Sequence, residues 1–202
     1  MANVFVNPFT DFGFKKIFGG DPAPSGGVLG SRQEASKPHL MDFLNALLPS
    51  EAQIKDLSFK NLEQLPDIED YRKAVYDIYC QGVNSEYFIV ELQNARQNYF
   101  KDRTIYYSTF PIQEQAQKGE WNYRLQPVYC IGVLGFTFHE SEIPAVIHRV
   151  KLKNQHNQVF YKKPTLIYLE MPNFNKSLEE LSISLKCSMI HECQNNQQFL
   201  SI

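Results

Sequence analysis

The chain has 202 residues, of which 43% are hydrophobic and 13% aromatic, and its 20 Lys and Arg against 22 Asp and Glu give a formal net charge of −2. This length predicts one compact domain, and the hydrophobic fraction excludes a chain that is disordered throughout. The near-neutral charge excludes a protein that coats nucleic acid non-specifically, but it allows a protein that binds DNA through a local patch.

Two features of the sequence bear on localisation. The longest apolar run, residues 128–138, is too short to span a bilayer. The first sixteen residues lack the basic start and apolar stretch of a signal peptide. We therefore expect a cytoplasmic protein that does not contact a membrane.

The N-terminal region predicts two helices separated by a loop. Thr10 and Asp11 are residue types that begin helices, and the apolar residues after them recur at helical spacing up to a Gly-Gly pair. Residues 19–38 are rich in Gly, Pro and Ser without periodicity, which predicts a flexible loop or insertion. Residues 40–48 carry the apolar stripe of a second helix.

A β-hairpin is predicted next. Ile54 to Phe59 reads as a first strand, and residues 75–80 and 87–93 are β-rich runs that flank a Gly-Val-Asn-Ser turn. If that turn centres near Asn84, Tyr87 lies opposite Gln81.

The same register places two carboxylates together. Asp77 falls opposite Glu91, and Gln93 shares a sheet face with Glu91 because side chains alternate along a strand. Adjacent carboxylates among apolar residues are costly unless they are neutralised, and Mg²⁺ prefers such oxygen ligands. The alternative is a solvated edge strand whose acids pair with a neighbouring arginine or lysine.

The rest of the chain alternates between helix and strand. Residues 94–118 have helical spacing, with Pro111 expected to kink or split the helix. Residues 128–138 read as a central strand buried on both faces, and residues 146–152 and 165–170 as further strands. Together these elements predict an α/β domain around a mixed sheet flanked by helices.

Several segments of the chain resemble the PD-(D/E)XK nuclease family, and more narrowly its transposase-related, recombination-promoting branch. The segments that carry the resemblance are NPFTDFGFKKIFG (7–19), LMDFLNALLP (40–49), AVYDIYC and YFIVELQ within 74–93, and RTIYYSTFPIQEQAQKGEWNY (103–123). The resemblance implies a restriction-endonuclease-like three-layer core. It also implies cleavage of DNA phosphodiesters with Mg²⁺, or Mn²⁺ in its place.

The resemblance assigns roles to individual residues. Asp77 and Glu91 match the two metal-binding acids of the family's catalytic set, and Gln93 stands where the wider superfamily has lysine. A neutral amide offers only hydrogen bonds, whereas an ammonium also stabilises charge. Asp11 resembles an auxiliary metal-binding acid, and a role in capping the first helix explains it equally well.

Two residues of the helix after the catalytic strand are candidates for binding DNA. Arg103 and Tyr107 could contact a phosphate. The alternative is that the tyrosine packs in the core and the arginine pairs with an acid such as Asp77.

The expected organisation is a nuclease-like domain over residues 1–181, with 19–38 as an insertion, followed by an irregular tail over 182–202. The tail departs from the family, and a truncated or frameshifted end would account for it. The leading expectation is a metal-dependent DNA endonuclease linked to transposition or recombination. The rival is an inactive nuclease-like domain that binds DNA or a protein without cutting.

Charge is divided unevenly along the chain. Residues 1–93 carry 8 basic and 13 acidic side chains, and residues 94–170 carry 10 basic and 6 acidic ones. The second region therefore offers a modestly basic stretch that could follow a nucleic-acid backbone.

Overall fold

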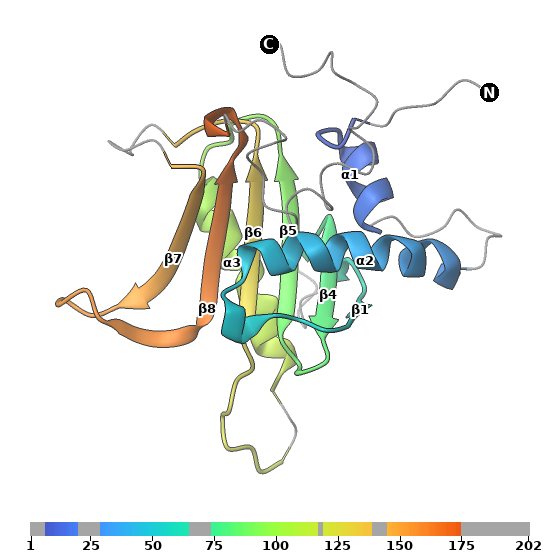
Figure 1. Ribbon diagram of the computed structural model, residues 1–202. Helices are drawn as coiled ribbons and strands as arrows, with labels where there is room; N and C mark the ends of the chain where they lie inside the picture. The colour runs from blue at the N-terminus through green and yellow to red at the C-terminus, as the bar shows by residue number, and fades with distance from the viewer. Residues whose placement is uncertain (1–6, 20–28, 65–73, 117–118, 139–144, 175–202) are drawn as a thin grey trace, which may run out of the picture. The chain divides into compact units, whose positions relative to one another are not determined.

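A computed structural model describes residues 7–19, 29–64, 74–116, 119–138 and 145–174 (Figure 1). The described residues up to Lys55 belong to one unit, and residues 56–174 form another. Within these ranges no helix has both the length and the apolar character that a membrane crossing requires.

The first unit begins with helix α1, Asp11–Phe18. Thr10 is the N-cap, and its hydroxyl oxygen accepts a hydrogen bond from the N–H of Gly13 at 3.0 Å. Gly19 ends the helix in the left-handed conformation, with φ at 79°, which glycine adopts without a steric cost. The predicted first helix is confirmed, but the cap is Thr10, so the capping role considered for Asp11 is wrong.

Helix α2, Leu29–Leu47, begins earlier than the sequence pattern indicates. The prediction of a loop over residues 19–38 is therefore wrong for residues 29–38. Pro38 lies inside the helix, where its missing N–H removes one hydrogen bond without ending the helix. Gln33, Glu34 and Ala35 favour helix over loop. A short 3₁₀ turn, Ser50–Ala52, follows.

The second unit is built on a six-stranded mixed sheet in the order β1-β4-β5-β6-β8-β7. Strands β5, β6 and β8 run parallel, and the other neighbouring pairs are antiparallel. A 3₁₀ turn, Met171–Asn173, follows the last strand. The strands span β1 Leu57–Phe59, β4 Ile78–Gly82, β5 Tyr87–Gln93, β6 Val128–Leu134, β7 Ile147–Lys153 and β8 Val159–Glu170.

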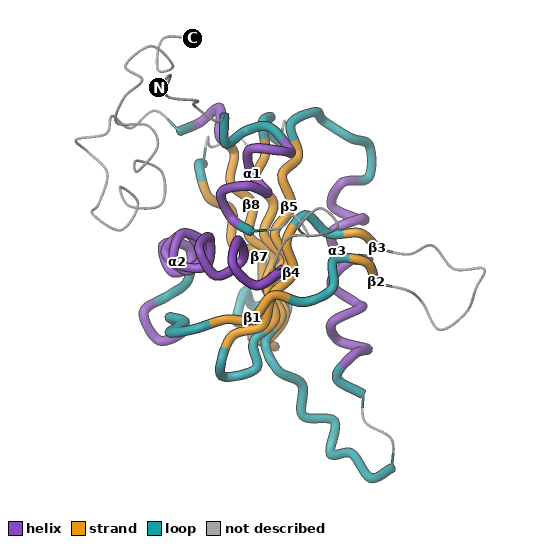
Figure 2. The backbone as a smooth tube through the Cα atoms, turned by 90° about the vertical axis from the view of Figure 1, so that its right-hand side faces the viewer, coloured by secondary structure: helices purple, strands orange, loops and turns teal. Residues whose placement is uncertain are grey.

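The predicted hairpin is confirmed in its register, since Gln81 pairs with Tyr87. Its first strand is interrupted, however, because the chain passes from a small sheet to the main sheet. The small sheet pairs β2, Glu63–Gln64, with β3, Ala74–Val75, and Figure 2 shows it beside α3 and apart from the main sheet. The N–H of Tyr76 still donates to Leu62 in the β2 segment, whereas Ile78 already pairs with Val90 of β5.

Helix α3, Phe100–Glu114, connects β5 to the parallel strand β6 and packs on one face of the sheet (Figure 1). Phe110 of the helix joins a buried cluster with Tyr79, Ile89 and Cys130 of the strands. This cluster is the apolar core on that face.

Pro111 does not split α3, so this half of the prediction is wrong, while the kink stays a prediction. A proline at position 111 leaves the carbonyl of Tyr107, four residues earlier, without its helical donor. The hydroxyl of Tyr76 donates to that carbonyl at 3.0 Å. The missing helical bond is thus replaced from outside the helix, and the helix continues to Glu114.

The three later strands predicted from the sequence are confirmed as strands, but their bounds differ from the predicted ones. Strand β6 is central and almost entirely buried, as its continuous apolar run predicts. Strand β8 begins at Val159, six residues before the predicted start, because β7 continues to pair with it beyond a bulge. The predicted tail, 182–202, lies outside the described residues.

Candidate functional site

Asp77 lies where the chain changes sheets. Even-numbered residues of β5 direct their N–H groups toward β4, which the pairing of Gly82 with Glu86 establishes. Leu92 would therefore donate to residue 76, but residue 76 pairs with the small sheet instead. The carboxylate of Asp77 takes that place, with Oδ2 accepting from the N–H of Leu92 at 2.8 Å.

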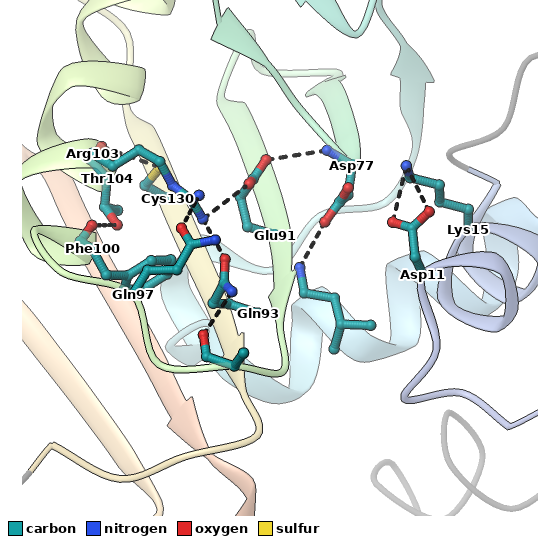
Figure 3. Close-up of polar contacts among 12 residues, drawn as sticks. Asp11, Lys15, Asp77, Glu91, Gln93, Gln97, Phe100, Arg103, Thr104 and Cys130 are labelled. Atoms are coloured by element: carbon teal, nitrogen blue, oxygen red, sulfur yellow. Dashed lines mark hydrogen bonds and ion pairs between the residues drawn. The ribbon is translucent and has the colours of Figure 1, made fainter.

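Glu91 is tied to Asp77 by a second hydrogen bond. Its Oε1 accepts from the backbone N–H of Asp77 at 3.1 Å (Figure 3). The side chain of Glu91 is 14% exposed. The prediction that these two acids lie beside each other is therefore confirmed.

Glu91 points to the face of the sheet that α3 covers. Its partner on β6 is Gly132, and a Cβ on that glycine would lie 3.3 Å from the ring of Phe100 at the start of α3. Because Gly132 has no side chain, β6 places no side chain beside Glu91. Residues of α3 can therefore lie next to Glu91, and Arg103 is the one that does.

Arg103 links Glu91 to Gln93. Its Nη2 donates to Oε1 of Gln93 at 2.7 Å, and lies 3.9 Å from Oε2 of Glu91. Its Nη1 donates to Oε1 of Gln97 at 2.6 Å, so the guanidinium lies between two amides (Figure 3). The guanidinium also packs over the Phe100 ring, 5.0 Å from its centre. These contacts fix both the position and the plane of the charge.

Gln93 is held at both ends of its amide. Its oxygen accepts from Arg103, and its Nε2 donates to the carbonyl of Ala95 at 2.7 Å. An amide oxygen has two lone pairs, so it can accept a second hydrogen bond while it stays bonded to Arg103.

The electrostatic balance of the site is negative. Asp77 and Glu91 bring two formal negative charges and Arg103 brings one positive charge. Burial first, and Glu91 second, raise the pKa of the Cys130 thiol above its ordinary range. Burial is also the main cause that raises the pKa of Tyr76, to which Cys130 and Glu91 add. Cys130 and Tyr76 therefore both stay neutral, and neither adds a charge to the site.

The donor set fits a hard divalent cation. Two carboxylates, one just before β4 and one on β5, offer oxygen ligands. Mg²⁺ commonly keeps several waters and takes only one or two protein carboxylates. In the part of the chain that the structure describes, no group of three or more His, Cys, Asp or Glu could hold a metal ion. A metal at this site would therefore complete its coordination with water or phosphate.

Asp11 belongs to the other unit of the chain. Its Oδ1 lies 3.1 Å from Nζ of Lys15, one turn along α1. The carboxylate is exposed, so this ion pair contributes little to stability. The metal-binding role of Asp11 stays a prediction.

Tyr107 packs against Tyr76, with the ring centres 5.4 Å apart. The guanidinium of Arg103 also lies over the Tyr107 ring, 5.7 Å from its centre. The structure therefore shows the alternative considered for each residue: Tyr107 packs against the core, and Arg103 pairs with an acid. That acid is Glu91, whereas the example named from the sequence is Asp77.

Sequence reasoning missed Gln97 and Leu92. Gln97 lies in the loop before α3, and Leu92 takes part only through its backbone. No residue pattern signals either contact, because each depends on where β5 ends relative to the next helix and strand.

The mixed sheet, its parallel strands joined through α3 and the paired acids on one face define an α/β, restriction-endonuclease-like protein. The family model described as "PD-(D/E)XK nuclease family transposase" matches residues 8–197, and the chain belongs to this family. The match extends beyond residue 181, where the resemblance seen in the sequence ends. No curated protein and no solved structure matches the chain.

Proposed function

We propose that this protein is a Mg²⁺-dependent DNA endonuclease that hydrolyses phosphodiester bonds in transposition or recombination. The observation that supports this most strongly is the hydrogen bond from the N–H of Asp77 to Glu91, which keeps the acid before β4 beside the acid on β5. Membership in a family of nuclease-related transposases supports DNA as the substrate.

Asp77 and Glu91 would hold the metal, with Mn²⁺ able to replace Mg²⁺. When bound, the metal supplies Lewis acidity to a phosphate oxygen and lowers the pKa of a bound water. The chain's own residues then orient the reactants. The second lone pair of Gln93 Oε1 would accept a hydrogen bond from the attacking water and so orient the water toward phosphorus.

Arg103 would hold the phosphate. Its guanidinium is fixed by two amides and an aromatic ring, and a planar fork of donors matches the oxygens of a phosphate. The ring of Tyr107 packs against the guanidinium. The charge developing on phosphorus would thus meet a cation that is already in place.

Nicking of supercoiled plasmid with Mg²⁺ tests the proposal. We expect wild type to nick, and Asp77→Asn and Glu91→Gln each to lose about 100-fold or more in rate. Glu120→Gln is the matched control, because Glu120 is an exposed acid in the loop after α3. Equal nicking by wild type and Asp77→Asn would overturn the assignment.

A second function is favoured by one observation. Gln93 replaces the lysine of the wider superfamily, and its amide is already occupied by Arg103 and Ala95. An inactive nuclease-like domain that binds DNA or a protein without cutting would have this property. It predicts salt-dependent DNA binding with no product under Mg²⁺ or Mn²⁺.

A further inference from the structure

The β7–β8 hairpin extends beyond the rest of the sheet. Strand β6 begins to pair with β8 at Pro164, so the part of β8 before Pro164 pairs with β7 alone. Residues 152–163 therefore form a two-stranded extension, and we call this extension, together with Lys151 at its base opposite Thr165, the arm. Figure 1 shows it running away from the other strands. A β-bulge at Leu152 lies between Lys151 and the extension.

The arm is held in shape at both ends. At its tip, Oδ1 of Asn154 accepts from the N–H groups of His156 and Gln158 at 3.0 and 3.1 Å. Asn157 takes the left-handed conformation, with φ at 61°, which asparagine tolerates. At its base, the ammonium of Lys163 donates to the carbonyl of Leu125 in the loop before β6.

Every charged side chain of the arm is basic. Residues 143–169 contain five Lys and Arg and no Asp or Glu. Lys151, Lys153 and Lys162 are exposed, and no carboxylate among the described residues pairs with any of these three lysines. Such a set of like charges repels itself in the free protein and is complementary to a polyanion.

Protection of an exposed strand edge does not account for this arm. Lysines on edge strands prevent pairing with other chains, but protected edges do not usually display apolar side chains. Here Leu152 is 53% exposed and Phe160 is 80% exposed. The arm combines cations with apolar surface, as nucleic-acid-binding surfaces do.

We propose that this arm binds the sugar–phosphate backbone of the DNA through Lys151, Lys153 and Lys162. This inference rests on the proposed function, in which DNA is the substrate. Glu91 is in register with Gly132, and Gly132 with Tyr168, which is nine residues after Val159 on β8. At about 3.3 Å per residue along β8, Lys153, opposite Val159, is about 30 Å from the level of the acids, Lys162 about 20 Å and Lys151, opposite Thr165, about 10 Å. The three lysines therefore span about six base pairs along a duplex.

Fluorescence anisotropy on a duplex of about 30 base pairs in EDTA, titrated with KCl, tests the arm without cleavage. The variant is Lys151→Gln/Lys153→Gln/Lys162→Gln. We expect about tenfold weaker binding at low salt and a shallower plot of log K against log salt, by about 0.9 for each phosphate that the variant no longer neutralises. The corresponding Lys→Arg triple variant should restore both values, since it keeps the charge.

Lys16→Gln/Lys37→Gln/Lys55→Gln removes three lysines of the other unit and is the matched control. The inference is overturned if this control variant lowers the slope of log K against log salt as much as the arm variant does. It is also overturned if the arm variant has the same affinity and slope as wild type. Plasmid nicking separates the two proposals. If wild type nicks the plasmid and the arm variant binds DNA as wild type does, only the proposal for the arm is refuted. If the arm variant binds DNA more weakly and wild type does not nick, only the proposed endonuclease activity is refuted.

Discussion

The backbone N–H of Asp77 donates to Oε1 of Glu91 at 3.1 Å, so the two acids are linked through the main chain of one and the side chain of the other. The position of Glu91 therefore does not depend on the side chain at residue 77. The Asp77 carboxylate instead binds the N–H of Leu92, at a point where the sheet does not supply its regular partner. Asp77 thus has a structural role as well as its proposed metal-binding role, and the two roles can be separated.

Asp77→Asn and Asp77→Ala should differ in stability and agree in activity. Asparagine keeps an oxygen that accepts from Leu92, whereas alanine leaves that half-buried N–H without its acceptor. We expect alanine to cost about 1–2 kcal/mol of unfolding free energy and asparagine less than about 1 kcal/mol. Urea denaturation measures both values. Equal stabilities would show that water replaces the carboxylate at no cost.

Mg²⁺ should raise the thermal stability of wild type and not that of Glu91→Gln. A ligand that binds only the folded state adds about 2.7 kcal/mol at a concentration 100 times its dissociation constant. Neutralising Glu91 removes one of the two carboxylates, so the variant should show little shift over the same titration. A thermal-shift assay with Mg²⁺ measures this. Identical shifts in the two proteins would place the metal elsewhere.

Arg103→Gln should weaken nicking and strengthen Mg²⁺ binding. The guanidinium lies 3.9 Å from Glu91, where two unit charges interact by about 1 kcal/mol in water. Its removal should raise Mg²⁺ affinity several-fold, while the loss of a phosphate ligand should lower the nicking rate by about 10–100-fold.

Arg103→Lys distinguishes charge from shape at this position. It should restore the lower metal affinity of wild type but not its nicking rate, because an ammonium cannot bond to both amides and stack on Phe100. Parallel losses of metal affinity and rate in Arg103→Gln would show a merely structural residue.

The hairpin register could be predicted from the sequence because the position of the turn fixes it. A turn centred near Asn84 places Gln81 opposite Tyr87, as the structure has it. That pairing is sufficient to bring Asp77 and Glu91 together. The same kind of local pattern also predicts α1 and the central position of β6.

The continuity of α3 and the partner of Arg103 could not be predicted, because each depends on tertiary contacts. Pro111 stops a helix when nothing replaces its missing donor, and Tyr76, which replaces it, is thirty-five residues earlier in the chain. Gln97 and Glu91 reach Arg103 only because the loop after β5 returns α3 to the same face.

Stability should fall in mildly alkaline solution because of two buried thiols. Burial raises the pKa of Cys80 and Cys130 well above the ordinary value of about 8.5. The folded state keeps both thiols protonated while the unfolded state loses its protons above that value. Their stabilising contribution is therefore complete below about pH 8.5 and declines by about 1.4 kcal/mol per thiol for each further pH unit.

Urea denaturation at pH 7.5 and pH 9.5 under reducing conditions measures this decline. Tyrosines of the unfolded chain have an ordinary pKa near 10, so they contribute little in this range. The Cys80→Ala/Cys130→Ala variant should lose less stability between the two pH values than wild type does. The same pH dependence in both proteins would assign the effect to other groups.

The hydrogen bond from Tyr76 to the carbonyl of Tyr107 should show strong coupling to Pro111. Tyr76→Phe removes the hydroxyl that donates to this carbonyl, and we expect a cost of about 1–2 kcal/mol. In the Pro111→Ala background, residue 111 regains an N–H that can bond to Tyr107 within the helix. Tyr76→Phe should then cost less by about 1 kcal/mol. A double-mutant cycle by urea denaturation measures the difference, and additive effects of the two substitutions would show that the hydroxyl does not replace the missing helical bond.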